Sequence, residues 1–373
     1  MRYLKNNKGS ISVIVTVTLL FIVIIVSAAF TINSSIRKAQ LKSISSIKDT
    51  YAEDLSRKNE IYNEICEGIA SIEVAKENST FFNKNTVLKD QNDNEVTIPR
   101  GYKISNDSEI DVNKGIVIED NDSNQWVWIP VEDIEEIYDA STKTAKLYEF
   151  TNEGYKKQEN SLLMATEPDV VISKADSTVA DNDTNNLSKV LTGEFAQNIT
   201  IDSYKEQLQH EFDLMINSIQ KFNGFYIGRY EITGTTENPT EKPGTQLGMN
   251  WYDAYNVCKK LNNNNTSTTA EMMWDCQLQH TLIWLITTKN KTYNQIYDPT
   301  TWVTNTTGNT GSIDTLKTNN IYDLIGNYPE LGQGAFNSDT DYGRLCFSKN
   351  VNELIKPEST SNKASRATMY INE

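Results

Sequence analysis

Few side chains in this sequence could carry acid-base, thiol or metal chemistry. The histidines are His210 and His280 alone, and the four cysteines are spread along the chain with no C-x-x-C pair. A zinc site or a His-dependent catalytic triad needs several such groups close together. The sequence therefore predicts no metal site, and no catalytic residue is assigned.

The cysteines allow two interpretations. They are Cys66, Cys258, Cys276 and Cys346. A disulfide between Cys258 and Cys276 is possible, but we favour isolated buried thiols, since a free cysteine behaves as a small apolar side chain.

One acidic segment, 119–124 (EDNDSN), could present carboxylates to calcium. It lacks the glycine and the distal glutamate of a complete calcium loop, so a solvated turn is the better interpretation. The turn closes a predicted hairpin between 115–118 and 126–130. No cofactor is predicted, although calcium stays open.

The overall composition describes a folded, acidic protein. The chain has 373 residues, is 38% hydrophobic and carries a formal net charge of −15. This hydrophobic content can build a real core, and the negative charge without a Lys/Arg cluster excludes a nucleic-acid partner.

The amino-terminal segment predicts a membrane anchor. A basic leader, 1–10, precedes an uncharged apolar run, 11–32, which as a helix would span about 33 Å. We expect a single-pass protein with a cytoplasmic amino terminus and with its bulk outside the cell. A signal peptide cleaved near 27–29 is the alternative.

The order of Lys8-Gly9, Ser10 and an apolar helix resembles the leader of type IV pilins, in which a peptidase cuts after the glycine. The resemblance implies cleavage between Gly9 and Ser10 and pilus or secretion-system subunits as partners. The acidic residue that the family has at the fifth mature position is Ile14 here, which argues against a major pilin.

Residues 33–78 follow as a predicted extracytoplasmic helical stalk, because apolar residues recur at steps of three, four and seven between charged ones. The stalk could pack on its own head, which we favour, or associate with other chains.

The head, 79–373, mixes predicted helices and strands, with a polar insertion around 135–200. The patterns predict helices from about 203 to 221, from 250 to 261 and from 270 to 287, and an aromatic strand over 222–234. Arg229 and Glu231 in that strand suggest buried ion pairs that fix structure.

Four ordered segments, GFYIGRYEITG, NWYDAYNVCKKLN, EMMWDCQLQHTLIWLI and TNNIYDLIGN, resemble the formylglycine-generating-enzyme-like, or sulfatase-modifying-factor, domain. That family is a variant of the C-type-lectin fold, so the resemblance implies an α+β, lectin-like head. It marks five structural motif residues: Arg229, Glu231, Trp251, Gly326 and Asn327.

The departures from the family bear on function. The family continues Gly-Asn-Val-Trp-Glu-Trp, where this chain has Gly326-Asn327-Tyr328-Pro329-Glu330-Leu331. Catalytic members hold copper with two neighbouring cysteines near the carboxyl end, whereas Cys346 stands alone here. A thiolate pair is what a cuprous ion prefers, so the oxidase is kept only as an alternative.

The preferred prediction is a membrane-anchored or pilus-associated surface protein whose non-catalytic head binds a protein or a glycan. A structural minor pilin or pseudopilin is the third hypothesis. Late loops rich in Asn, Asp and Tyr suit adaptable hydrogen bonding. The candidate ligand residues in them are Asn305, Asn309, Asp339, Asp341 and Tyr342.

Overall fold

The computed structural model describes residues 7–66, 71–151, 154–157, 184–261, 265–298, 305, 307–325, 328–335, 344–347, 353–355 and 363–372. It is a mixed α+β structure of two compact units, Met1–Asn63 and Glu64–Glu373. The candidate residues Gly326, Asn327, Asp339, Asp341 and Tyr342 lie outside the described residues.

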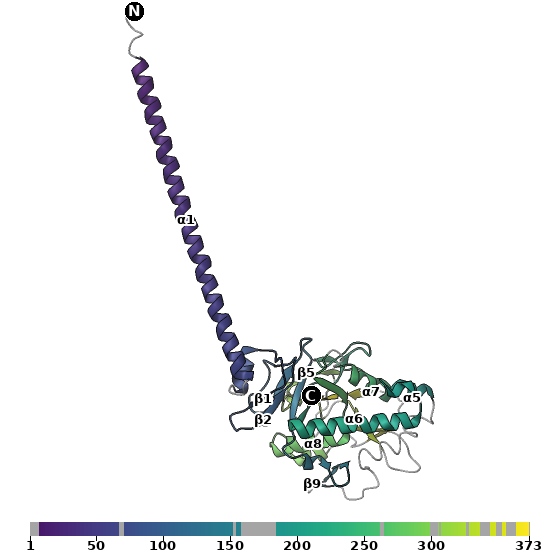
Figure 1. Ribbon diagram of the computed structural model, residues 1–373. Helices are drawn as coiled ribbons and strands as arrows, with labels where there is room; N and C mark the ends of the chain where they lie inside the picture. Colours follow the sequence, from purple (N-terminus) through teal and green to yellow (C-terminus); the bar gives the residue numbers. More distant parts are fainter. Residues whose placement is uncertain are drawn as a thin grey trace, which may run out of the picture. The chain divides into compact units, whose positions relative to one another are not determined.

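The first unit is formed by all but the last three residues of α1 (Asn7–Cys66), one uninterrupted helix of 60 residues (Figure 1). It takes in Gly9 and Ser10 and most of the predicted stalk. Its large apolar side chains between Val15 and Leu55 are exposed wherever the structure describes them, from 48% at Leu55 to 68% at Tyr51. Within the part of the chain that the structure describes, no helix is both long enough and apolar enough to cross a membrane.

The range predicted as the stalk, 33–78, contains the end of α1 and a second helix. A separate helix, α2 (Ile72–Asn78), begins with Ser71 as its N-cap and buries Ile72 and Ala75. The Lys76 ammonium donates to the carbonyl of Ser108 at 2.6 Å. These contacts make α2 part of the second unit, because its apolar face is already covered there.

A six-stranded sheet forms the centre of the second unit. Its order is β14-β22-β10-β5-β4-β3, and every neighbouring pair is antiparallel. The carboxyl-terminal strand therefore lies inside the sheet, between two strands from the middle of the chain. The strands are β3 (Lys103–Ile104), β4 (Val117–Glu119), β5 (Gln125–Pro130), β10 (Gly224–Gly228), β14 (Thr268–Met272) and β22 (Ala367–Ile371).

Both faces of the sheet are covered, as the burial of every residue of β10 shows. On one face Phe225 lies beside His280 of α8 (Asp275–Thr287), with ring centroids 6.4 Å apart. On the other face the Tyr226 hydroxyl donates to the Thr97 carbonyl at 2.8 Å. Thr97 belongs to the hairpin of β1 (Thr86–Lys89) and β2 (Glu95–Ile98). The period-two alternation of a strand thus places consecutive aromatic side chains in two different layers.

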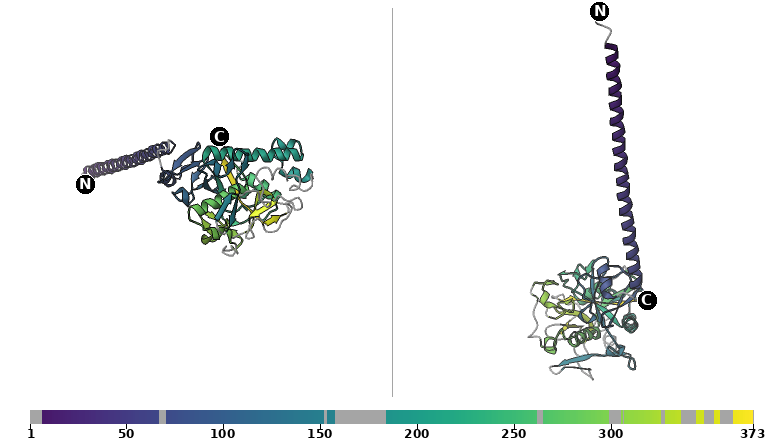
Figure 2. Two further views of the ribbon diagram at one scale, coloured as in Figure 1. Left: turned by 90° about the horizontal axis from the view of Figure 1, so that it is seen from below. Right: turned by 90° about the vertical axis from the view of Figure 1, so that its left-hand side faces the viewer.

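Besides α8, two further helices accompany the sheet, the long α6 (Ile201–Phe222) and the shorter α7 (Trp251–Lys260) (Figures 1 and 2). The hydroxyl of Ser218 in α6 donates to the Ile371 carbonyl at 2.8 Å, and the amide of Ile371 donates back at 3.0 Å. Asn223 ends α6 in the left-handed conformation at φ 58, which asparagine tolerates better than most residues.

A second, four-stranded sheet has the order β20-β19-β18-β21, with β18 and β21 parallel. Short hairpins and helices complete the described chain. The strands of this sheet are β18 (Glu330–Ala335), β19 (Arg344–Phe347), β20 (Glu353–Ile355) and β21 (Ala364–Ser365). The remaining pairs are β6 (Tyr138–Asp139) with β7 (Thr144–Ala145), β8 (Tyr148–Thr151) with β9 (Gly154–Lys157), β11 (Thr233–Gly234) with β12 (Pro239–Thr240), β13 (Gly244–Thr245) with β15 (Asn309–Thr310) and β16 (Lys317–Thr318) with β17 (Ile321–Tyr322). The short helices are α5 (Thr184–Val190) and α9 (Tyr293–Tyr297).

Several predicted elements are confirmed. The hairpin of β4 and β5 closes at the acidic turn, α6 spans the predicted 203–221, and α7 ends at Lys260, close to the predicted 261. Cys258 and Cys276 are buried and are not joined in a disulfide, as we favoured.

The predicted helix over 270–287 is wrong at its start. Residues 270–272 belong to β14, where Glu271 pairs with Thr368 and Met272 with Ala367 of β22. Helix α8 begins only at Asp275. The apolar spacing fits a helix, but pairing with a strand nearly one hundred residues later decides the conformation.

The predicted strand over 222–234 is also shorter than expected. Phe222 still belongs to α6, and β10 ends at Gly228. Arg229 and Tyr230 form a bend, so the two charged motif residues follow the strand.

Candidate functional site

The charged motif residues lie in the core, each with partners from distant segments. Arg229 is 2% exposed, and its guanidinium donates to Gln125 Oε1 at 2.7 Å and to the Asn320 carbonyl at 3.2 Å. It also forms an ion pair with Asp107 at 3.3 Å. Glu231 is fully buried, and its amide donates to the Thr310 hydroxyl. Arg229 thus has an ion-pair partner, as its sequence setting predicted, although the Asp107 side chain is 67% exposed.

A second buried arginine, Arg366, forms hydrogen bonds to several segments of the head. Arg366 precedes β22 and is fully buried, and its guanidinium donates to Glu330 Oε1 at 2.8 and 3.0 Å. It also donates to the carbonyls of Gly228 at 2.8 Å and Tyr322 at 2.7 Å. This one cation thus joins β10, β17, β18 and β22.

Three carboxyl groups surround this cation. Burial alone would lower the pKa of Arg366, but the nearby charges of Glu330, Glu231 and Glu241 raise it. Burial raises the pKa of Glu330, although Arg366 opposes that shift. Burial raises the pKa of Glu241 well above its ordinary value, with Arg366 again opposing. One guanidinium cannot neutralise three buried carboxyl groups, so burial outweighs the effect of Arg366 on Glu241 and the pKa of Glu241 stays raised.

The third motif position, Trp251, begins α7 and is fully buried. Its indole N–H donates to the Gly332 carbonyl at 3.0 Å, and its ring stacks on Tyr255 with centroids 5.2 Å apart. Trp251 therefore connects α7 to β18 and has no exposed surface for a ligand.

The two described ligand-loop candidates have different surroundings. Asn305 is 4% exposed, and its amide donates to the Asn309 carbonyl at 3.0 Å and to Asp323 at 3.1 Å. Its side chain is thus part of the internal hydrogen-bond network. Asn309 is exposed in β15 and accepts a hydrogen bond from the Thr245 hydroxyl at 2.8 Å.

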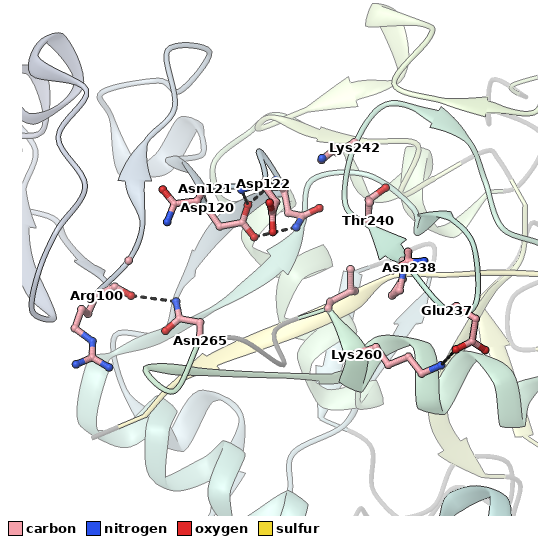
Figure 3. A pocket seen from close by; sticks show the side chains of 14 residues that line it. Arg100, Asp120, Asn121, Asp122, Glu237, Asn238, Thr240, Lys242, Lys260 and Asn265 are labelled. Carbon is pink, nitrogen blue, oxygen red and sulfur yellow. Dashed lines mark hydrogen bonds and ion pairs between the residues drawn. The ribbon is translucent and has the colours of Figure 1, made fainter.

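An open polar hollow of about 690 Å³ lies elsewhere on the head (Figure 3). Five segments meet around it: the chain after β2, the β4–β5 turn, the segment through β12, the end of α7 and the residue at 265. It is lined by Arg100, Gly101, Asp120, Asn121, Asp122, Asn124, Glu237, Asn238, Pro239, Thr240, Lys242, Lys260, Leu261 and Asn265.

The acidic turn forms one wall of the hollow. Asp120 accepts hydrogen bonds from the amides of Asp122 at 2.9 Å and Asn124 at 2.8 Å, and from the Asn124 side chain at 2.9 Å. Burial raises the pKa of Asp120, and its contacts with Asn124 act in the opposite direction. Asp120 thus shapes the turn, whereas Asn121 and Asp122 are exposed.

Opposite walls carry paired and hydrogen-bonded side chains (Figure 3). Lys260 donates to the Thr236 carbonyl at 2.8 Å and lies 3.4 Å from the Glu237 carboxylate. The Asn265 amide donates to the Arg100 carbonyl at 3.1 Å. Acidic, basic and amide side chains therefore make up most of the residues that line the hollow, together with Gly101, Pro239 and Leu261.

The buried charge cluster supports one wall directly. The amide of Glu241 donates to Asn124 Oδ1, and the amide of Gln125 donates to the Glu241 carbonyl, both at 3.0 Å. The side chain of Glu241 lies so close to Gly228 that an added Cβ there would be 2.5 Å from it. Glu241 thus joins the segment through β12 to the central sheet, between the lining residues Thr240 and Lys242.

The described residues give little support for a metal site or for a reactive thiol. Among them, no group of three or more His, Cys, Asp or Glu side chains is arranged to hold a metal ion. Burial raises the pKa of Cys258 to about 12, although a contact with Ser365 opposes the shift. A thiol with this pKa stays protonated at neutral pH and is a poor metal ligand or nucleophile.

The sequence reasoning missed Arg366, Glu241 and the hollow. The signal for Arg366 was a single arginine placed directly before a carboxyl-terminal apolar strand, but its partners could not be inferred from spacing. Comparison with known proteins adds no relative, since no family model, curated protein or solved structure matches this chain.

Proposed function

We propose that this protein is a surface protein with a membrane anchor, whose lectin-like head binds a hydroxyl-rich ligand, a glycan, without catalysing a reaction. The observation that carries the proposal is the polar hollow beside the acidic turn. The head is proposed as a formylglycine-generating-enzyme-like variant of the C-type-lectin fold.

The lining of the hollow favours a glycan over an apolar molecule. Its volume of about 690 Å³ is within the usual range of ligand pockets. Four of its lining residues are asparagines, and an amide both donates and accepts hydrogen bonds, as a sugar hydroxyl does. Three basic and three acidic residues balance one another, so the lining selects no strongly charged ligand.

The core contacts support the proposed family. They also support the proposal that this head does not catalyse the family's reaction. Glu231, Trp251 and Glu330 occupy positions of the resembled motifs, and all three are buried in the head. Glu330 is engaged by Arg366 and Trp251 by Gly332, so these residues stabilise the scaffold. The alternative, a copper-dependent oxidase, needs two neighbouring thiolates, which the protonated Cys258 does not supply.

The anchoring proposal rests on the uncharged sequence 11–32 and on the basic leader before it. Cleavage between Gly9 and Ser10 would support association with pili or a secretion system. In the remaining alternative, a structural minor pilin, the helix packs into the filament. The head is then displayed on the filament surface and binds no ligand.

Glycan binding can be tested on the full chain in detergent micelles. A glycan array identifies ligands, and titration calorimetry then compares the wild type with an Asn121→Ala/Asn238→Ala variant. Losing two hydrogen bonds should weaken binding about 30-fold, since each contributes about 1 kcal/mol. A Glu206→Gln variant, altered on the exposed side of α6, should bind like the wild type.

The outcomes separate the hypotheses. Equal binding by the Asn121→Ala/Asn238→Ala variant and the wild type would remove the hollow as the site. Stoichiometric copper together with oxidation of a substrate cysteine would favour the oxidase. Copurification with filaments, with no glycan bound, would favour the minor pilin.

A further inference from the structure

The part of α1 that follows the apolar run carries a row of uncovered apolar side chains. Six of them are 48% to 68% exposed: Ile36, Leu41, Ile44, Ile47, Tyr51 and Leu55. At about 100° of rotation per residue they fall within about 140° of one another around the helix. They form a stripe, which we call the stalk stripe, and the same arc of the helix also holds Arg37, Gln40, Lys48, Asp54 and Lys58.

A helix with such an apolar stripe is not expected to be stable on its own in water. Most helices are held by packing of an apolar face rather than by intrinsic propensity. Charged residues occupy the opposite side, among them Lys42, Glu53 and Glu60. The stalk stripe therefore has the pattern of a helix that packs against one partner.

Charges beside the stripe indicate what that partner is. Relative to the centre of the stripe, Lys48 lies about 60° to one side and Asp54 about 60° to the other. In a parallel, two-fold pair of helices, each edge of one stripe faces the opposite edge of its partner. Lys48 of each copy then faces Asp54 of the other, about 9 Å along the axis, which a lysine side chain can span.

We infer that the stalk stripe is an interface between two copies of this chain, packed parallel and in register. The in-register arrangement forms two Lys48–Asp54 pairs by symmetry. Within each copy Asp54 also lies 3.2 Å from Lys58, so each pair extends into a three-charge network. The parallel orientation rests on the proposed membrane anchor, which places both amino termini in one bilayer.

The dimer would change how the head works. Two heads on one stalk bind a repeated ligand at two points, and the second contact forms at a high effective concentration. Two hollows that each bind the ligand weakly would thereby give the dimer a high overall affinity for a repeated ligand.

Cysteine cross-linking of the full chain in native membranes tests the interface. In a Cys66→Ser/Cys346→Ser background, Tyr51→Cys places a thiol at the centre of the stripe. Its matched control, Glu53→Cys, lies about 160° away on the same turn. We expect at least tenfold more disulfide-linked dimer from Tyr51→Cys than from Glu53→Cys.

Charge reversal tests the register independently. Lys48→Glu and Asp54→Lys should each lower the dimer fraction, measured by native mass in micelles, and the double reversal should restore it. Unchanged dimer in both single variants would overturn the proposed register.

Equal or absent cross-linking at the two positions would overturn the interface. This includes the case in which the head of the same chain covers the stripe, since the protein then stays monomeric. Fractionation of the same sample separates this failure from that of the anchor, because a chain missing from the membrane fraction contradicts the anchor instead.

Discussion

Glu271 makes the stability of the head depend on pH. It lies on β14, is 6% exposed and accepts a hydrogen bond from the Tyr370 hydroxyl at 3.1 Å. Burial, and secondarily the charge of Glu211, raise its pKa to about 8 from an ordinary value of 4.5, while Lys259 and Tyr370 act in the opposite direction. The folded head therefore keeps a proton that the unfolded chain releases.

The sign and size of the effect follow from linkage. Below pH 4.5 the carboxyl group is protonated in both states, and its contribution to stability is fully present. As the pH rises toward about 8, the free energy of unfolding falls by about 1.4 kcal/mol per pH unit because of this group. Between pH 5 and pH 7 the loss amounts to about 3 kcal/mol.

Glu271→Gln should remove this dependence, because a glutamine stays neutral and can still accept from Tyr370. We expect the variant to match the wild type near pH 5 and to be about 3 kcal/mol more stable at pH 7. Urea unfolding followed by tryptophan fluorescence measures this, since all six tryptophans lie in the head.

The free energy of unfolding is plotted against pH for the wild type and for Glu271→Gln, and the two slopes are compared. Glu241 and Glu330 contribute equally to both slopes, so the difference between the slopes reports on Glu271 alone. Glu206→Gln, which changes an exposed carboxyl group on α6, should keep the wild-type slope. The reasoning is refuted if Glu271→Gln loses stability between pH 5 and pH 7 as steeply as the wild type does.

Three further results are expected. Arg366→Met should destabilise the head by about 3–5 kcal/mol in urea unfolding, because it leaves a buried carboxylate without its cation; unchanged stability would contradict the central role of the arginine. Gly228→Ala should cost about 1–3 kcal/mol, since its Cβ would lie 2.5 Å from the Glu241 carboxylate, whereas Gly248→Ala, with open space around it, should cost little. Mass spectrometry of the native amino-terminal peptide should find Ser10 as the mature terminus, and an intact leader would exclude prepilin-type processing.

Local patterns predicted the elements that depend on neighbouring residues. The 3.6-residue spacing of Leu208, Phe212, Met215 and Ile219 predicted α6, and all four side chains are buried. The turn chemistry of 119–124 predicted the β4–β5 hairpin. In both cases the interactions that fix the conformation lie within a few residues.

Predictions failed where a distant segment decides the conformation. The spacing of Met273, Trp274, Leu278 and Leu282 suited one helix from residue 270, yet Glu271 pairs with Thr368 in the sheet. The site was missed for the same reason, because residues from 100 to 265 contribute to its lining. Sequence spacing cannot show which loops will be neighbours.

By itself, the sequence determined the mixed helix and strand content, the long amino-terminal helix and the buried state of Arg229 and Glu231. These follow from periodicity and from the cost of isolated charges in apolar segments. Only the tertiary structure decided that Arg366 lies among three carboxyl groups and that Glu241 holds one wall of the hollow against the sheet. Such arrangements depend on long-range strand pairing, which brings residues more than one hundred positions apart into a single low-dielectric core.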